Sequence, residues 1–148
     1  MKIEIKWKTG SRFSADPEKA YAELEAIRKT GSGDIDPEAV IDRAKKKTSA
    51  IHNEFEWDDT EAAHQHRLAT ARTIVRSIQC IRTERPEVTA RVYESVIVKQ
   101  REKEESAPKR VYRTTEDILK DPILRDQLLM NAIRELAAFR QKYSGLSE

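Results

Sequence analysis

The stretch TEAAHQHRLATARTIVRSIQCIRT, residues 60–83, is the longest part of the chain with a helical apolar period. Its apolar side chains recur every three or four residues and define one broad buried face. These residues are Leu68, Ala71, Ile74, Val75, Ile78 and Ile81. The spacing therefore predicts one long central helix from about Thr60 to about Thr83. Pro86 ends the pattern, because proline lacks a backbone donor and pushes the preceding residue out of helical geometry.

Beyond Pro86 the apolar period changes from that of a helix to that of a strand. Residues 88–98 alternate and are rich in β-branched side chains, which predicts a strand. Residues 110–113 are predicted to return beside it as the second strand of a β-hairpin. Residues 100–108 are charged and hold no apolar residue except Ala107, so we expect a flexible hairpin loop there.

The flanking segments complete the predicted fold. Residues 2–8 alternate as a short half-buried strand does. Aspartate followed by proline and glutamate, at Asp16 and at Asp36, is typical of a capped helix start. Asp121 and Pro122 begin a C-terminal helix whose apolar stripe we expect to hold the core together. That stripe comprises Leu124, Leu128, Leu129, Ile133, Leu136 and Phe139.

Taken together, the pattern predicts one α+β domain over residues 1–148 that is predominantly helical. It has a short N-terminal strand, three helices including the long central one, a β-hairpin and the C-terminal helix. The length of 148 residues leaves room for one domain of ordinary size. The apolar content is only 38%, but its helical period argues against disorder.

Composition also limits where the protein acts. No apolar run approaches the ~18 residues of a membrane span, and the N-terminus alternates charged with apolar residues, unlike a signal peptide. Cys80 is the single cysteine, so it cannot form an internal disulfide. We therefore expect a soluble cytoplasmic protein without a membrane partner.

The segment from His52 to Asp59 has the highest density of metal-binding residue types, with four carboxylates and one histidine. A hydrolytic metal site needs carboxylates that converge on one point, which closeness in sequence does not ensure. The structural interpretation is favoured: Asp58 and Asp59 cap the following helix, while Phe55 and Trp57 anchor the loop to the core. The prediction is no catalytic residue, no metal site and no cofactor.

The central helix also offers a basic face. Between Ala62 and Thr83 it has four arginines and no acidic residue. Arg72 and Arg76 are four residues apart and share one side. Together with Arg113, on the polar side of the predicted hairpin, they are the expected phosphate contacts of a nucleic-acid-binding surface. The near-neutral net charge of +2 weighs against this interpretation.

The run Ser49–Asp59, which contains the His-x-x-Phe-Glu-Trp-Asp-Asp motif, resembles small proteins encoded by tailed bacteriophages and prophages. Ile51 stands where that group is expected to have leucine. The resemblance also covers residues 7–13, 36–40, 121–125 and 135–140. It implies a setting in the cytoplasm of a bacterial host cell and does not imply an activity.

Two hypotheses from different classes follow. The leading one is a non-enzymatic phage or prophage accessory protein that binds DNA or a DNA-processing assembly. The alternative is a protein-interaction module that inhibits or recruits a host or defence protein, or assembles with itself as a homo-oligomer. In that case Trp57, Tyr93 and Tyr112, expected to be exposed, would make the contact. An enzyme ranks third and would need a metal at Glu54–Asp59.

Overall fold

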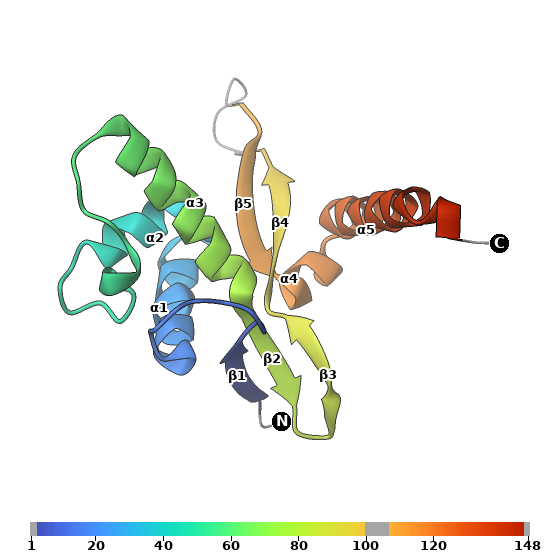
Figure 1. Ribbon diagram of the computed structural model, residues 1–148, viewed down its shortest axis with the longest axis horizontal. Coiled ribbons are helices and arrows are strands. Elements are labelled where there is room, and N and C mark those ends of the chain that lie inside the picture. Colours follow the sequence, from blue (N-terminus) through green and yellow to red (C-terminus); the bar gives the residue numbers. More distant parts are fainter. Residues whose placement is uncertain (1–2, 100–106, 147–148) are drawn as a thin grey trace. The chain divides into compact units, whose positions relative to one another are not determined.

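The computed structural model describes residues 3–99 and 107–146 (Figure 1). The loop expected over residues 100–108 therefore lies, from 100 to 106, outside the described residues. Helix accounts for 53% of the structure and strand for 22%, so the fold is α+β with helix predominating, as predicted. The chain forms two compact units, Met1–Thr115 and Glu116–Glu148.

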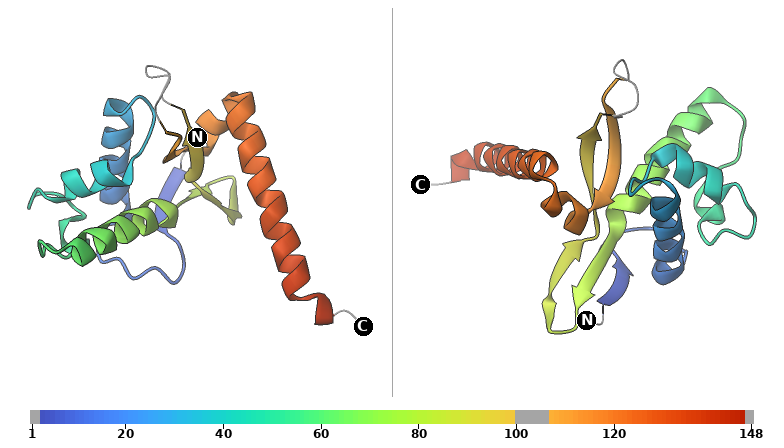
Figure 2. Two further views of the ribbon diagram at one scale, coloured as in Figure 1. Left: turned by 90° about the horizontal axis from the view of Figure 1, so that it is seen from above. Right: turned by 180° about the vertical axis from the view of Figure 1, so that it is seen from behind.

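The larger unit combines three helices with two small antiparallel sheets. Its helices are α1 (Pro17–Thr30), α2 (Pro37–Ala44) and α3 (Glu61–Ser77). The first sheet has the order β1-β2-β3, with β1 (Ile3–Trp7), β2 (Ile78–Arg82) and β3 (Arg85–Arg91). The second sheet pairs β4 (Tyr93–Val98) with β5 (Lys109–Thr114). Figures 1 and 2 show the three helices together on one side of the two sheets.

The predicted helix starts are confirmed. The Asp16 carboxylate accepts a hydrogen bond from the amide of Lys19, and the Asp36 carboxylate accepts one from the amide of Glu38. Proline follows each aspartate at the first helical position, where a missing N–H costs nothing. Both helices therefore begin where short-range capping chemistry predicts.

The prediction of one helix over residues 60–83 is wrong at its C-terminal end. Helix α3 stops at Ser77, and β2 begins at Ile78 without an intervening turn. The reason is pairing with β1, in which Trp7 lies opposite Ile78 and Ile3 lies opposite Arg82. If residues 78–82 were helical, the backbone N–H and C=O groups of β1 would lose the hydrogen-bond partners that β2 provides.

The prediction of one strand over residues 88–98 is also wrong, because two strands meet there. Strand β3 pairs with β2 in the first sheet, and β4 pairs with β5 in the second. Val92 lies between them, and its amide donates to the carbonyl of Ile78 at 3.3 Å. The returning strand of the predicted hairpin is confirmed, with Val96 opposite Val111.

The core of the larger unit lies between the three helices and the sheets. Its fully buried side chains include Leu24 of α1, Ile41 of α2, Ile74 of α3 and Tyr93 of β4. All three helices and strands of both sheets therefore contribute to one hydrophobic cluster.

The smaller unit contains α4 (Thr115–Lys120), except its first residue, and α5 (Pro122–Lys142). Of the stripe expected to hold the core, Leu124 is buried, whereas Leu129, Ile133, Leu136 and Phe139 each expose more than half of their surface. That expectation is wrong, since an apolar period predicts an apolar face without saying what covers it. Among the residues that the structure describes, no helix combines the length and apolar character needed to cross a bilayer.

The His52–Asp59 segment joins the end of α2 to the start of α3. The His52 ring stacks on the Trp57 ring with centroids 5.2 Å apart. The ring nitrogen Nδ1 of His52 lies 2.7 Å from the carbonyl of Ala44, and Trp57 Nε1 donates to the His52 carbonyl at 3.1 Å. Phe55 is buried. The anchoring role expected for the aromatic residues is therefore confirmed.

The acidic residues of this segment have different roles from those expected. Thr60, and not Asp58 or Asp59, caps α3 by accepting a hydrogen bond from the amide of Ala63. Glu54 accepts three hydrogen bonds at 2.8–2.9 Å, from the amide and hydroxyl of Ser14 and from the amide of Ala15. It therefore ties the segment before α1 to the segment before α3.

Trp57→Ala should lower the free energy of unfolding by about 2 to 5 kcal/mol, because it removes packing against the core and the stack on His52. Trp57→Phe keeps a ring and should cost clearly less. Urea denaturation of the three proteins measures this. A Trp57→Ala value within about 0.5 kcal/mol of wild type would show that this segment does not anchor the fold.

Candidate nucleic-acid interface

The outer side of α3 presents Arg72 and Arg76 to solvent. Its inner side buries Ala71, Ile74 and Val75, so the two arginines point away from the core. Arg76 Nε donates to the backbone carbonyl of Arg72 at 3.3 Å. Within the described residues neither guanidinium forms an ion pair, and no acidic residue occurs from Ala62 to Ser77. Both cations are free to meet an external anion.

The β2–β3 hairpin, which follows α3 directly, carries a second pair of arginines. Arg82 and Arg85 lie opposite each other at the end of the hairpin, and both are exposed. Like charges that face each other across two strands destabilise the pairing. No described acidic side chain forms an ion pair with either residue. An anion bound between them would relieve this repulsion.

Strand β3 is exposed along its whole length. None of its seven residues is buried, so neither of its faces packs against a covering segment of the described chain. Figures 1 and 2 show the turn between β2 and β3 lying away from α2. Strand β2 is paired with β1 along its whole length, so β3 is an edge strand of a three-stranded sheet.

The outer face of the first sheet adds a polar row across its three strands. Lys6 lies opposite Gln79, which lies opposite Arg91. The inner face of the same sheet contributes Trp7 and Ile78 to the core. Arg91 has an acidic neighbour, Glu94, at 3.6 Å. The sheet therefore presents cations and an amide on the side that the core does not use.

We call Arg72, Arg76, Arg82 and Arg85, which form no ion pair within the described residues, the α3–hairpin arginines. Two of them, Arg72 and Arg76, were predicted as phosphate contacts, and the structure brings them onto adjacent turns of α3. Arg82 and Arg85 were missed as a pair, because the strand register that places them opposite each other is not visible in the sequence.

The third predicted phosphate contact, Arg113, has a different environment. It lies on β5, where its Nε forms an ion pair with the Asp34 carboxylate. Both side chains are about three-quarters buried. Since its charge already has an acidic partner within the fold, we do not include Arg113 among the α3–hairpin arginines.

The aromatic residues predicted to be exposed lie in or against the core. Tyr93 and Tyr112 are only 1% and 4% exposed, so the expectation that they are accessible is wrong. Trp57 is partly buried and also lies beneath the Arg67 guanidinium, 5.8 Å from the ring centroid. The alternation of residue types along β4 and β5 predicted that these strands have two different faces. It did not predict which of the faces the helices cover.

Tyr93 instead belongs to a polar cluster that joins β4 to α1. Its hydroxyl donates to Glu25 Oε1 at 2.7 Å, and Arg28 forms an ion pair with the same carboxylate at 2.7 Å. Burial acts to raise the pKa of Glu25, but the hydrogen bonds from Arg28 and Tyr93 outweigh it and hold that pKa below its ordinary value. Burial and the hydrogen bond to Glu25 raise the pKa of Tyr93.

No described group of three or more histidine, cysteine, aspartate or glutamate side chains is placed to hold a metal ion. Of the acidic segment, Glu54 is engaged by residues 14 and 15, while Asp58 and Asp59 are exposed. One of the carboxylates that a metal centre at Glu54–Asp59 would require is thus engaged in hydrogen bonds within the fold.

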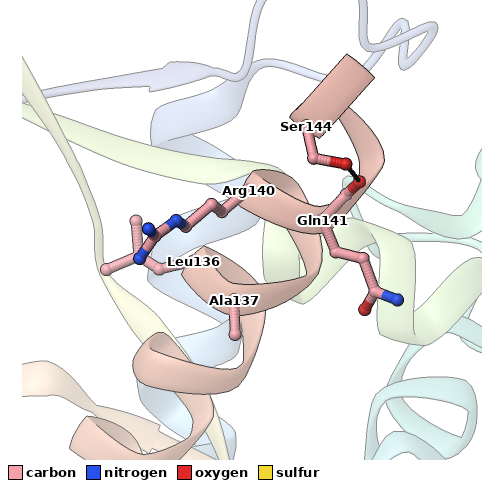
Figure 3. Close-up of a pocket in the computed structure, with 5 residues that line it drawn as sticks. All are labelled: Leu136, Ala137, Arg140, Gln141 and Ser144. Carbon is pink, nitrogen blue, oxygen red and sulfur yellow. Dashed lines mark hydrogen bonds between the residues drawn. The ribbon is translucent and has the colours of Figure 1, made fainter. Parts of the chain in front are cut away.

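An open hollow lies along the C-terminal part of α5, where Figure 3 shows Leu136 and Arg140 extending to the same side of the helix. Ala137, Gln141 and Ser144 complete its lining, and the Ser144 hydroxyl donates to the Gln141 carbonyl at 2.8 Å. No acid, histidine or cysteine is among these five lining residues. The hollow therefore lacks the paired groups of an acid–base or nucleophilic site.

Tyr93→Phe should destabilise the protein by about 1 to 3 kcal/mol at neutral pH, because it removes a hydrogen bond to a charged group. The low folded-state pKa of Glu25 stabilises the fold above the unfolded pKa, and this contribution is lost as pH falls through the folded pKa. The variant raises the folded pKa of Glu25, so its stability should fall less between neutral and acidic pH than that of wild type.

Tyr112→Phe is the matched control, since no described group hydrogen-bonds to the Tyr112 hydroxyl. Thermal unfolding between about pH 3 and pH 7 measures both variants. Equal effects of the two substitutions at every pH would contradict the role given to the Glu25–Tyr93 hydrogen bond.

Comparison of the chain with protein-family models, with curated proteins and with solved structures finds no match.

Proposed function

We propose that the chain is a non-enzymatic accessory protein of a tailed phage or prophage, and that it binds DNA in the cytoplasm of the bacterial host. The α3–hairpin arginines make the contact, with α3 and the β2–β3 hairpin engaging the phosphate backbone. The setting derives from the resemblance of Ser49–Asp59 to phage proteins. The mode of binding derives from the arrangement of charge described above.

One observation carries the proposal: the continuous segment from α3 to β3 has a net positive charge larger than that of the whole chain. Residues 62–91 contain six arginines against two glutamates, a net charge of +4, whereas the whole chain has +2. The remainder of the chain is therefore net negative by two charges. The net charge of the whole chain is therefore nearly neutral although residues 62–91 are basic. The low net charge is then no longer an argument against nucleic-acid binding.

The kind of basic residue in this segment favours phosphate groups as the binding partner. All six cations of the segment are arginines and none is a lysine. The planar guanidinium group donates two parallel hydrogen bonds to a phosphate, whereas an ammonium group acts as a point charge. The surface therefore favours a ligand with many phosphate groups over one with a single carboxylate.

Whether the protein binds DNA directly or binds a DNA-processing assembly depends on which partner the β2–β3 hairpin contacts. Phosphate contacts position a protein without reading sequence, and base contacts specify the sequence. Gln65, an exposed residue on α3, and Gln79 on β2 are the amide side chains that could read base edges beside the arginines. We therefore propose direct binding to duplex DNA with weak sequence preference.

The charge-reversed variant Arg72→Glu/Arg76→Glu should bind a labelled duplex of about 20 base pairs at least tenfold more weakly than wild type at low salt. The loss of two phosphate contacts should also reduce the slope of log K against log salt by about 2. Fluorescence anisotropy at several salt concentrations measures both quantities. Circular dichroism checks that the variant is folded.

Lys19→Glu/Lys29→Glu on α1 is the matched control. Both lysines are exposed, and the variant changes the net charge of the protein by the same amount. Its binding should stay within about threefold of wild type, because α1 lies outside the basic segment. If the two double variants lose affinity equally, binding depends on total charge and the α3–hairpin arginines are not its site.

A further inference from the structure

One side of α5 presents a run of large apolar residues to solvent. Their spacing of three or four residues places them along one face of the helix. The run comprises Leu129, Ile133, Leu136, Phe139 and Tyr143, which are between 42% and 68% exposed. The rings of Phe139 and Tyr143 lie 4.8 Å apart on this face. Leu124, near the start of α5, is buried.

This face reaches the upper part of the range found on monomers. A large apolar side chain that is about half exposed presents on the order of 100 Å² to water, so the five residues amount to roughly 500 Å². Monomeric proteins rarely present a contiguous patch above about 300–600 Å², whereas a stable dimer buries about 800 Å² on each partner. The area fits a helix-to-helix interface.

The sequence of α5 has the repeat that two paired helices require. Within α5, Leu129 and Leu136 are seven residues apart, and the intervening pair Ala132 and Phe139 has the same spacing; Tyr143 at the C-cap and Leu146 in the following 3₁₀ turn continue the two sets in sequence. These two sets occupy the a and d positions of a heptad repeat. Leu128 and Ile133 then flank the seam and widen it.

The charged residues that flank the seam identify a second copy of α5 as a suitable partner. In a parallel pair, Glu135 lies across the seam from Arg140 of the partner subunit, and Leu128 lies across from Ile133 of the partner subunit. In an antiparallel pair, Glu135 comes opposite Lys142 of the partner subunit. Neither Glu135 nor Arg140 forms an ion pair with a residue that the structure describes. Either orientation therefore joins opposite charges and apolar surfaces.

We propose that the protein forms a homodimer in which the Leu129–Tyr143 face of α5 packs against the same face of a second copy. The interface is independent of the α3–hairpin arginines, which lie in the larger unit. Its failure and the failure of DNA binding are therefore separable. The dimer also gives each particle two basic segments, so DNA affinity should fall when the dimer is broken.

Sedimentation velocity at about 50 μM tests the proposal, because self-association depends on concentration. Wild type should sediment with twice the 17.1 kDa mass of one chain. Leu136→Glu places a charge in the seam and should sediment as a monomer. Ala138→Glu introduces the same charge on the opposite, exposed side of α5 and should remain a dimer. The Arg72→Glu/Arg76→Glu variant should also remain a dimer.

Three results would overturn the proposal. The first is a wild-type protein that stays monomeric at this concentration. The second is a Leu136→Glu variant that dimerises like wild type. The third is a monomeric wild type whose melting temperature drops in Leu136→Glu but not in Ala138→Glu, which would mean that the chain itself covers this face of α5 in solution.

Discussion

The direct passage from α3 into β2 at Ile78 is the constraint on which the larger unit depends. Ile74 of the helix and Ile78 of the strand lie in one continuous core, so the two elements cannot rotate independently. Strands β1 and β3 pair on either side of β2, and the hydrogen bond from Val92 to Ile78 sets where β4 begins. One side of α3 packs into the core, so Arg72 and Arg76 lie on its solvent-facing side.

The parts of the fold that depend on neighbouring residues were predictable from the sequence. Helix starts at Asp16 and Asp36 follow from side chains that cap amides two or three residues away. The end of α3 was not predictable, since Ile78 and Ile81 suit both a helix and a strand. The decision comes from pairing with β1, at the opposite end of the larger unit in sequence. Long-range pairing overrides local period here.

The difference between short-range and long-range interactions also explains which parts of the candidate site could be predicted from the sequence. Arg72 and Arg76 could be predicted because the helical period alone assigns them to the outer side. The opposition of Arg82 to Arg85 depends on strand register, and the ion pair of Arg113 with Asp34 depends on a contact between distant segments. The structure adds that Arg72, Arg76, Arg82 and Arg85 form no ion pair with a residue that it describes, and that the last two face each other in a segment of net charge +4.

Amide chemical shifts recorded by NMR during titration with duplex DNA would test the central claim most directly. If the α3–hairpin arginines bind DNA, the largest changes should fall on the second half of α3 and on the β2–β3 hairpin, with α1 and α2 little affected. The changes should diminish as salt is added, because phosphate binding releases counterions. Perturbations confined to α1 and α2, or spread evenly over the surface, would contradict the assignment of DNA binding to the α3–hairpin arginines.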